Sequence, residues 1–391
     1  MNAPGSRRGL PAGLSARWVR LRLGAAERKA RLPDVQGWAA DAWRRAPRWG
    51  QWLARLAVVV LAVLAPANAI GQIMAPASDW KTILFYPIGV YVLLGVGLNV
   101  VVGQAGMLDL GYVAFFAIGA YTMAVLGIDA HLNFWIILPG GIVLAAISGL
   151  ILGAPTLRLR GDYLAIVTLG FGEIIQITAT NVSFTGGPQG MAGIPHPPSI
   201  DHIGFLSYGV LDPRPYYYLV LALIIVVIVV ARRLERSRVG RAWAAIREDE
   251  DAAELMGVPT FRFKLWAFVI GASIAGAAGV LFSAKTIAIT PDDFPLLLSI
   301  LVLSAVVLGG AGNLPGVVVG AFVVAWLPER FRGLANYRVL IFGLTLIVMM
   351  IFRPDGLFPA RRRRSSLRAG RTAASAPVAA VNLTEAETEA P

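Results

Sequence analysis

Few side chains in this sequence can do acid–base or ligand chemistry, and the most unusual of them lies in apolar surroundings. Glu173 follows Gly170, Phe171 and Gly172 inside an apolar stretch. An ionisable group within a membrane is costly and marks a functional candidate by default. Glu173 can line a transport pathway, or it can anchor neighbouring helices through hydrogen bonds, and the residues alone leave both interpretations open.

Three more polar residues precede it in or beside apolar stretches. Asp109 lies near one end of an apolar run, where a carboxylate also favours the positive N-terminus of a helix. Asn99 and Gln104 flank the short connection before that run, where turn or packing roles are the simpler interpretation. The candidates for a translocation pathway are Asn99, Gln104, Asp109, Gly170, Phe171, Gly172 and Glu173.

Glycines predict irregular backbone at two places. Gly170 and Gly172 interrupt one apolar stretch, and residues 310–316 form a Gly- and Pro-containing connection between two others. Broken helices beside a cavity are common in transporters. We therefore expect non-helical backbone at both places.

The sequence carries no recognisable catalytic or metal-binding set. There is no Gly-Lys pair, so a phosphate-binding P-loop is excluded, and neither a zinc-protease motif nor a nucleophile elbow occurs. The chain has no cysteine, and its three histidines form no i, i+4 pair. We expect no enzyme activity, cofactor or metal, and a transporter of this kind must take its energy from a partner.

Residues 232–257 are densely charged and lie between the apolar runs 216–231 and 265–284. Val239, Trp243, Ile246, Ala253 and Met256 recur within them at roughly helical spacing. This pattern predicts a short amphipathic helix whose apolar side needs a partner's groove. The alternative is a solvated connector.

Composition places the whole chain in a membrane. Hydrophobic residues make up 57% and charged residues 15%, whereas soluble domains carry about 25% charged residues. We predict an all-α polytopic membrane protein with about 8–10 spans, some of them short or broken. The expected spans are 52–70, 83–102, 107–127, 134–154, 163–180, 216–231, 264–284, 296–310, 316–327 and 338–352, of which 296–327 is either two crossings or one re-entrant hairpin.

The basic residues predict the orientation. If both termini are cytosolic, the cytosolic segments hold 28 of the Lys and Arg residues and the outer segments hold six, as the positive-inside rule requires. The net charge of +12 therefore indicates a membrane surface and not nucleic acid. The predicted parts are a basic, Trp-rich cytosolic extension (1–51), a transmembrane domain (52–352) with a cytosolic loop (232–263) and an outer loop (181–215), and a basic, disordered tail (353–391).

Six segments, in order along the chain, resemble the LivM-type permease subunit of branched-chain amino-acid ABC importers. They are residues 97–106, 110–121, 157–175, 185–195, 240–257 and 309–316, and the resemblance covers about 82–356. It implies an inner-membrane importer with a second, LivH-like permease, two ABC ATPase subunits and an extracytoplasmic substrate-binding protein. Permeases for urea, short amides or aromatic acids are similar. Two alternatives of other classes are a carrier driven by an ion gradient and a membrane scaffold or sensor.

The resemblance also implies that residues 240–257 form the helix that couples to an ATPase. The match to the importer pattern Glu-Ala-Ala-x-x-x-Gly is partial, because Asp251 stands in place of Glu. Charge reversal at Asp249 and Glu250, or Trp243→Ala, is then expected to cut coupling without affecting membrane insertion. The implied coupling residues are Gly240, Arg241, Trp243, Ile246, Arg247, Asp249, Glu250, Ala252, Ala253, Met256 and Gly257.

Overall fold

The computed structural model describes residues 60, 62–66, 79–157, 162–198, 208–209, 212–330, 337, 340, 343–344, 347 and 356–358. The chain divides into two units, Met1–Leu64 and Ala65–Pro391, and every element named below belongs to the second. The regular secondary structure of the described part is helical apart from one pair of two-residue strands. The predicted all-α class is therefore confirmed, whereas the spans 52–70 and 338–352 lie largely outside the described residues.

One helical span, kinked at Tyr86, forms the centre of the bundle, because Tyr86 has extended backbone (φ −134°, ψ 125°). It runs over Trp80–Gln104 and consists of α5 (Trp80–Ile83), the π-helix η1 (Leu84–Gly89), α6 (Val90–Leu98) and the π-helix η2 (Asn99–Gln104). Within its most apolar window 89% of the residues are buried. A helix that is apolar on all sides is buried by its neighbours, and here those neighbours are other helices.

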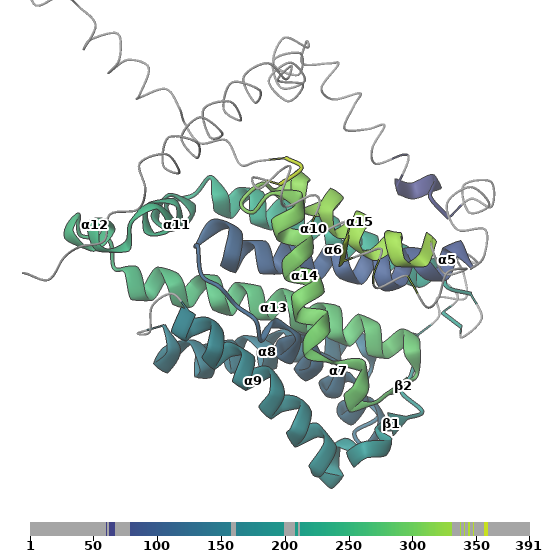
Figure 1. The fold of residues 1–391 in the computed structure, drawn as a ribbon. Coiled ribbons are helices and arrows are strands. Elements are labelled where there is room, and N and C mark those ends of the chain that lie inside the picture. The colour runs from purple at the N-terminus through teal and green to yellow at the C-terminus, as the bar shows by residue number, and fades with distance from the viewer. Residues whose placement is uncertain are drawn as a thin grey trace, which may run out of the picture. The chain divides into compact units, whose positions relative to one another are not determined.

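α13 (Thr260–Thr286) is the second buried span and runs beside α6 (Figure 1). α7 (Tyr112–Ile128) and α8 (Phe134–Thr156) pack on α13. In α9 (Asp162–Asn181) and α10 (Arg214–Glu235), only 28% of the most apolar window is buried. These two helices therefore keep wide apolar faces open, as helices at a lipid boundary do.

Small residues let α7, α8 and α13 approach closely. A Cβ added to Gly119 would lie 2.1 Å from the Gly276 carbonyl oxygen, and one added to Gly279 would lie 2.0 Å from the Phe116 carbonyl oxygen. The backbones are so close that no side chain fits at those positions. Small residues at helix contacts are typical of membrane proteins, because lipid supplies no hydrophobic drive for association and helices must gain packing contacts instead.

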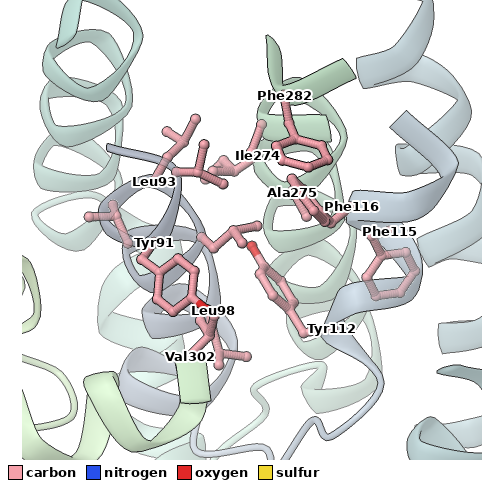
Figure 2. Close-up of a cluster of buried hydrophobic side chains, with 14 of the residues drawn as sticks. Tyr91, Leu93, Leu98, Tyr112, Phe115, Phe116, Ile274, Ala275, Phe282 and Val302 are labelled. Carbon is pink, nitrogen blue, oxygen red and sulfur yellow. The ribbon is translucent and has the colours of Figure 1, made fainter. Parts of the chain in front are cut away.

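Aromatic side chains fill the space between the central helices. Figure 2 shows Tyr112, Phe115 and Phe116 of α7 facing Phe282 and its neighbours on α13, with residues of α6 and α14 (Leu296–Gly309) completing the cluster. The Tyr112 hydroxyl donates to the Gly271 carbonyl oxygen at 2.8 Å, so its buried polar atom is satisfied.

The segment 296–327 forms two helices and a turn. α14 and α15 (Leu314–Arg330) are separate helices packed against each other and joined by the turn 310–313. The backbone there is irregular as expected, because Gly310 and Gly312 have φ angles of 102° and 87°. The expectation for Gly170 and Gly172 was wrong, because α9 is an unbroken α-helix through both.

The number of described spans is lower than the predicted total. Six helices are long and apolar enough to cross a membrane, and Tyr112–Ile128 is a shorter apolar helix. The third span was expected to begin at residue 107, but 105–111 is not helical and α7 begins at Tyr112.

The two ends of the bundle are built differently (Figure 1). One end carries α11 (Arg238–Glu248) and α12 (Glu250–Leu255). The other carries η3 (Ser183–Thr185), η4 (Gly187–Gln189), β1 (Met191–Ala192), β2 (Ala288–Ile289) and η5 (Pro291–Asp293), with β1 and β2 antiparallel. The described start of the predicted outer loop therefore forms short helical turns and a β pairing that sequence patterns did not indicate.

Candidate functional site

α11 begins at a tight corner directly after α10. The Ser237 hydroxyl accepts hydrogen bonds from the amides of Val239 at 3.1 Å and Gly240 at 3.4 Å, so Ser237 caps the new helix. A Cβ at Gly240 would lie 2.3 Å from the Glu235 carbonyl oxygen. The corner therefore depends on a residue without a side chain at position 240.

The apolar face of α11 is covered by the chain itself. Trp243 has 0% of its surface exposed, and its indole Nε1 donates to the Phe263 carbonyl oxygen at 2.7 Å. Ile246 is buried on the same face. The prediction that this face waits for a partner's groove was wrong for these two residues, because the start of α13 already covers them.

Asp249 separates α11 from α12. Its backbone is extended (φ −159°, ψ 111°), and its carboxylate accepts from the Ala252 amide at 3.0 Å. The acidic residues Glu250 and Asp251 then occupy the first turn of α12, where the helix dipole favours negative charge. α12 ends after Leu255, and Gly257 has the positive φ of 83° typical of a helix C-terminus.

An ion pair attaches α12 to α13. The Glu250 carboxylate lies 2.5 Å from Lys264 Nζ, with the two side chains 27% and 7% exposed respectively. Ala253 is buried on the same side of α12. Glu250 thus interacts within the chain, and reversing its charge would disturb the chain's own packing as well as any partner.

The tip of α12 is the exposed part of the site. Leu255 and Met256 are 88% and 85% exposed. Residues 257–262 and Glu254 border a shallow hollow of about 360 Å³ beside them. Leu255, Met256 and this hollow are called the α12 tip below. Two large apolar side chains this exposed on a polar loop are typical of a protein-binding surface.

The candidate pathway residues separate into two groups. Asp109 accepts from the Gly111 amide at 2.9 Å, while a Cβ on Gly111 would lie 1.8 Å from the Thr168 carbonyl oxygen. A Cβ added to Gly172 would lie 3.4 Å from the Gly111 Cα. Asp109 and Gly172 therefore both lie beside Gly111.

Asn99 and Gln104 lie elsewhere, in η2 at the α11 end of the bundle. Asn99 has 0% exposure, and its Oδ1 accepts from the Gly312 amide at 2.8 Å. Both side-chain polar atoms of Gln104, the Oδ2 of Asp109 and the Nδ2 of Asn99 are buried without a protein partner. Polar groups buried in this way normally meet water or a ligand.

Glu173 is partly exposed on α9, between the exposed Ile174 and the close contact at Gly172. Phe171 packs on Phe115 of α7, with ring centroids 5.7 Å apart. Gly170 has open space around it. Glu173 therefore lies at the edge of the helix contact, and not in the central core.

Among the described residues no group of three or more histidine or acidic side chains is placed to hold a metal ion. The site is a polar helical corner with an apolar tip, and the bundle beneath it is a multi-pass membrane protein of helical spans.

The chain belongs to the family described as branched-chain amino acid transport system, permease component, whose family model matches residues 82–352. It is 42% identical to the high-affinity branched-chain amino acid transport system permease protein LivM of Escherichia coli over 299 residues, covering 72% of this chain and 70% of that protein. The probable LivM of Methanocaldococcus jannaschii is 26% identical over 56% of this chain and 68% of its own length. LivH of Escherichia coli is 34% identical over 30% of this chain and 41% of its own length. No solved structure matches.

Several residues of the site were not indicated by sequence patterns. Gly103, Gly106 and Ala311 contact Arg247, as described below. Leu255 was not singled out, because it falls outside the helical repeat of the other apolar residues. The sequence feature that could have indicated Leu255 is its position next to Met256 in a charged loop. Two adjacent residues of a helix point in different directions, so both cannot be buried against the same neighbouring helix.

Proposed function

We propose that this chain is the permease subunit of an ATP-driven importer that takes up branched-chain or related amino acids across a bacterial inner membrane. The observation that carries the proposal is the family match over residues 82–352, because it includes both the helical bundle and the α11–α12 loop. A LivH-like permease would complete the membrane part, and an extracytoplasmic binding protein would deliver the substrate.

The energy would enter at the α12 tip. The sequence has no P-loop of its own, so ATP hydrolysis belongs to separate subunits in this proposal. Leu255 and Met256 supply an apolar anchor at the end of the loop, and the acidic first turn of α12 surrounds it with charge. An apolar patch within a polar rim is the general plan of a protein–protein interface, and Met is enriched in such patches.

The distribution of basic residues supports a cytosolic position for the α11–α12 end. Residues 232–264 contain eight of the Lys and Arg residues, whereas membrane loops on the outer side are poor in them. In this orientation β1, β2 and the neighbouring turns would face the binding protein.

Reconstitution tests the proposed function. The chain is purified with its co-expressed permease, ATPases and binding protein, placed in liposomes, and supplied with radiolabelled leucine, urea or phenylalanine outside and ATP inside. Leucine accumulation that requires both ATP and the binding protein is the expected result. Uptake by the chain alone in a Na⁺ or H⁺ gradient would overturn the proposal, and ATP-dependent uptake of urea or phenylalanine without leucine would revise the substrate.

A further inference from the structure

Arg247 lies on α11 but points back into the bundle. Its Nη1 donates to the Gly103 carbonyl oxygen, and its Nη2 donates to the Ala311 carbonyl oxygen at 3.4 Å. The residue as a whole stays exposed, although its guanidinium binds these two carbonyl groups. A planar guanidinium with several fixed donors suits two acceptors from different segments better than an ammonium does.

The backbone beneath Arg247 is shaped to admit its side chain. Gly106 has a φ of +76°, and a Cβ there would lie 2.9 Å from Arg247 Cγ and 3.2 Å from its Cα. A side chain at position 106 would therefore collide with Arg247. The glycine both turns the chain after η2 and leaves room for the arginine.

The two carbonyl groups that Arg247 binds are already held together by Asn99. Its side-chain oxygen accepts from the Gly312 amide at 2.8 Å, in the turn that also contains Ala311. A Cβ at Gly103 would lie 2.0 Å from that same oxygen and 2.4 Å from the Gly312 nitrogen. The end of the central span and the α14–α15 turn thus form one unit, which we call the Arg247 junction (Arg247, Asn99, Gly103, Ala311 and Gly312).

The junction ends the most buried span of the protein in a π-helix. Ala105 donates its amide to the Val100 carbonyl oxygen at 3.2 Å, five residues back. π-Helical turns are rare and are concentrated at functional sites. The last carbonyl groups of a helix also carry partial negative charge and lack intrahelical donors, so a cation from another segment is a favourable partner.

α11 is therefore attached to the bundle at two places. Trp243 and the Glu250–Lys264 pair join the loop to α13, while Arg247 joins it to η2 and the α14–α15 turn. A force on the α12 tip reaches α13 through packing and α6 through Arg247. Arg247 makes the polar contact between this loop and η2, the segment that continues α6.

We propose that Arg247 is the positioning residue through which movement of α11 and α12 is transmitted to α6 and the α14–α15 turn. It determines how much substrate is moved per ATP hydrolysed, and not how tightly an ATPase binds. This inference rests on the proposed function, in which an ATPase docks on the α12 tip.

The test compares Arg247→Met and Arg247→Lys with Arg238→Met in the full transporter in liposomes. Arg238 begins the same helix, has the same charge and is also exposed. ATPase content, ATP hydrolysis and leucine uptake are measured together. For Arg247→Met we expect unchanged ATPase content and a fall in leucine moved per ATP by roughly tenfold or more, because the variant loses both charge-assisted hydrogen bonds and one alone corresponds to about that factor.

Arg247→Lys is expected to recover part of the ratio, because an ammonium reaches one carbonyl oxygen but does not span both. Arg238→Met is expected to keep the wild-type ratio. A wild-type ratio in Arg247→Met would overturn the inference, as would loss of the ATPase from that variant, which would make Arg247 a docking or folding residue.

Asn99→Leu provides a second test should Arg247→Met not assemble. It removes the acceptor for the Gly312 amide without touching α11, so the ratio should fall while the ATPase remains bound. An unchanged ratio would contradict the junction. Failure of the proposed docking can be distinguished from failure of this inference. If the ATPase does not dock on the α12 tip, it will stay bound in the double variant Leu255→Glu, Met256→Glu, independently of the result for the Arg247 variants.

Discussion

α11 and α12 belong to one charged loop, but their apolar residues meet opposite surroundings (Figure 1). Trp243 of α11 is fully buried against α13, whereas Leu255 and Met256 at the end of α12 are exposed to water. The extended backbone of Asp249 causes this difference, because it breaks the helical repeat between them. An amphipathic pattern therefore predicts that a helix has an apolar side. It does not predict whether that side is covered by the same chain or by a partner.

The largest effect is expected on the α11 side. Trp243→Ala removes a fully buried indole and its hydrogen bond, and should lower the free energy of unfolding by about 3–5 kcal/mol. Thermal unfolding of the purified protein in detergent measures this. Trp266→Ala is the matched control, because Trp266 is 59% exposed on α13. Equal losses in both variants would show that burial of Trp243 is not what holds α11.

The α12 tip should respond in the opposite way. Leu255→Glu combined with Met256→Glu should leave thermal unfolding unchanged but weaken ATPase binding by about 2 kcal/mol or more. Co-purification of the ATPase with the chain, at graded detergent and salt, reads this out. Leu132→Glu introduces an apolar-to-acidic change at an exposed residue of the α7–α8 connection and should leave the ATPase bound. If the tip variant keeps its ATPase, α12 is not the docking element.

The Glu250–Lys264 pair should have an effect on folding stability between those of Trp243 and of the α12 tip. Glu250→Gln should cost about 1–2 kcal/mol of folding stability, less than the ~3–5 kcal/mol of a fully buried pair, because Glu250 keeps contact with water. Unfolding curves of Glu250→Gln, Lys264→Met and the double variant give the coupling between the two residues. Glu254→Gln on the exposed side of α12 serves as a control. Additive losses would mean that the pair does not attach α12 to α13.

The smallest effects are expected at the two helix caps. Ser237→Ala and Asp249→Ala each remove a side-chain acceptor for helix amides and should cost about 1 kcal/mol. Amide hydrogen exchange distinguishes them: Ser237→Ala should loosen α11, and Asp249→Ala should loosen α12 alone. Simultaneous loosening of both helices in Asp249→Ala would show that they behave as one unit and would weaken the comparison.

Much of the architecture could be predicted from patterns of residue type. Long apolar runs correspond to spans, and glycines and alanines at helical spacing correspond to the close contacts of α7, α8 and α13. Glycine was a weaker guide to backbone shape. Gly310 and Gly312 form a turn, whereas Gly170 and Gly172 lie within the unbroken helix α9.

The candidate site was predictable as a segment but not as a set of contacts. Residues 240–257 were identified by their charge density and by the family resemblance. The direction in which each of their side chains points could not be predicted. Arg247 turns toward Gly103 and Ala311, which lie 144 and 64 residues away in the chain. No local pattern reports a contact over such separations.

The sequence by itself determined that this protein is a helical membrane bundle with a charged loop, because the transfer of apolar runs into lipid depends on composition. Only the tertiary structure decided which side of the loop faces its own bundle. The side is set by the carbonyl groups of α13, η2 and the α14–α15 turn, which bind Trp243 and Arg247. The positions of these carbonyl groups result from packing among helices that are far apart in the chain.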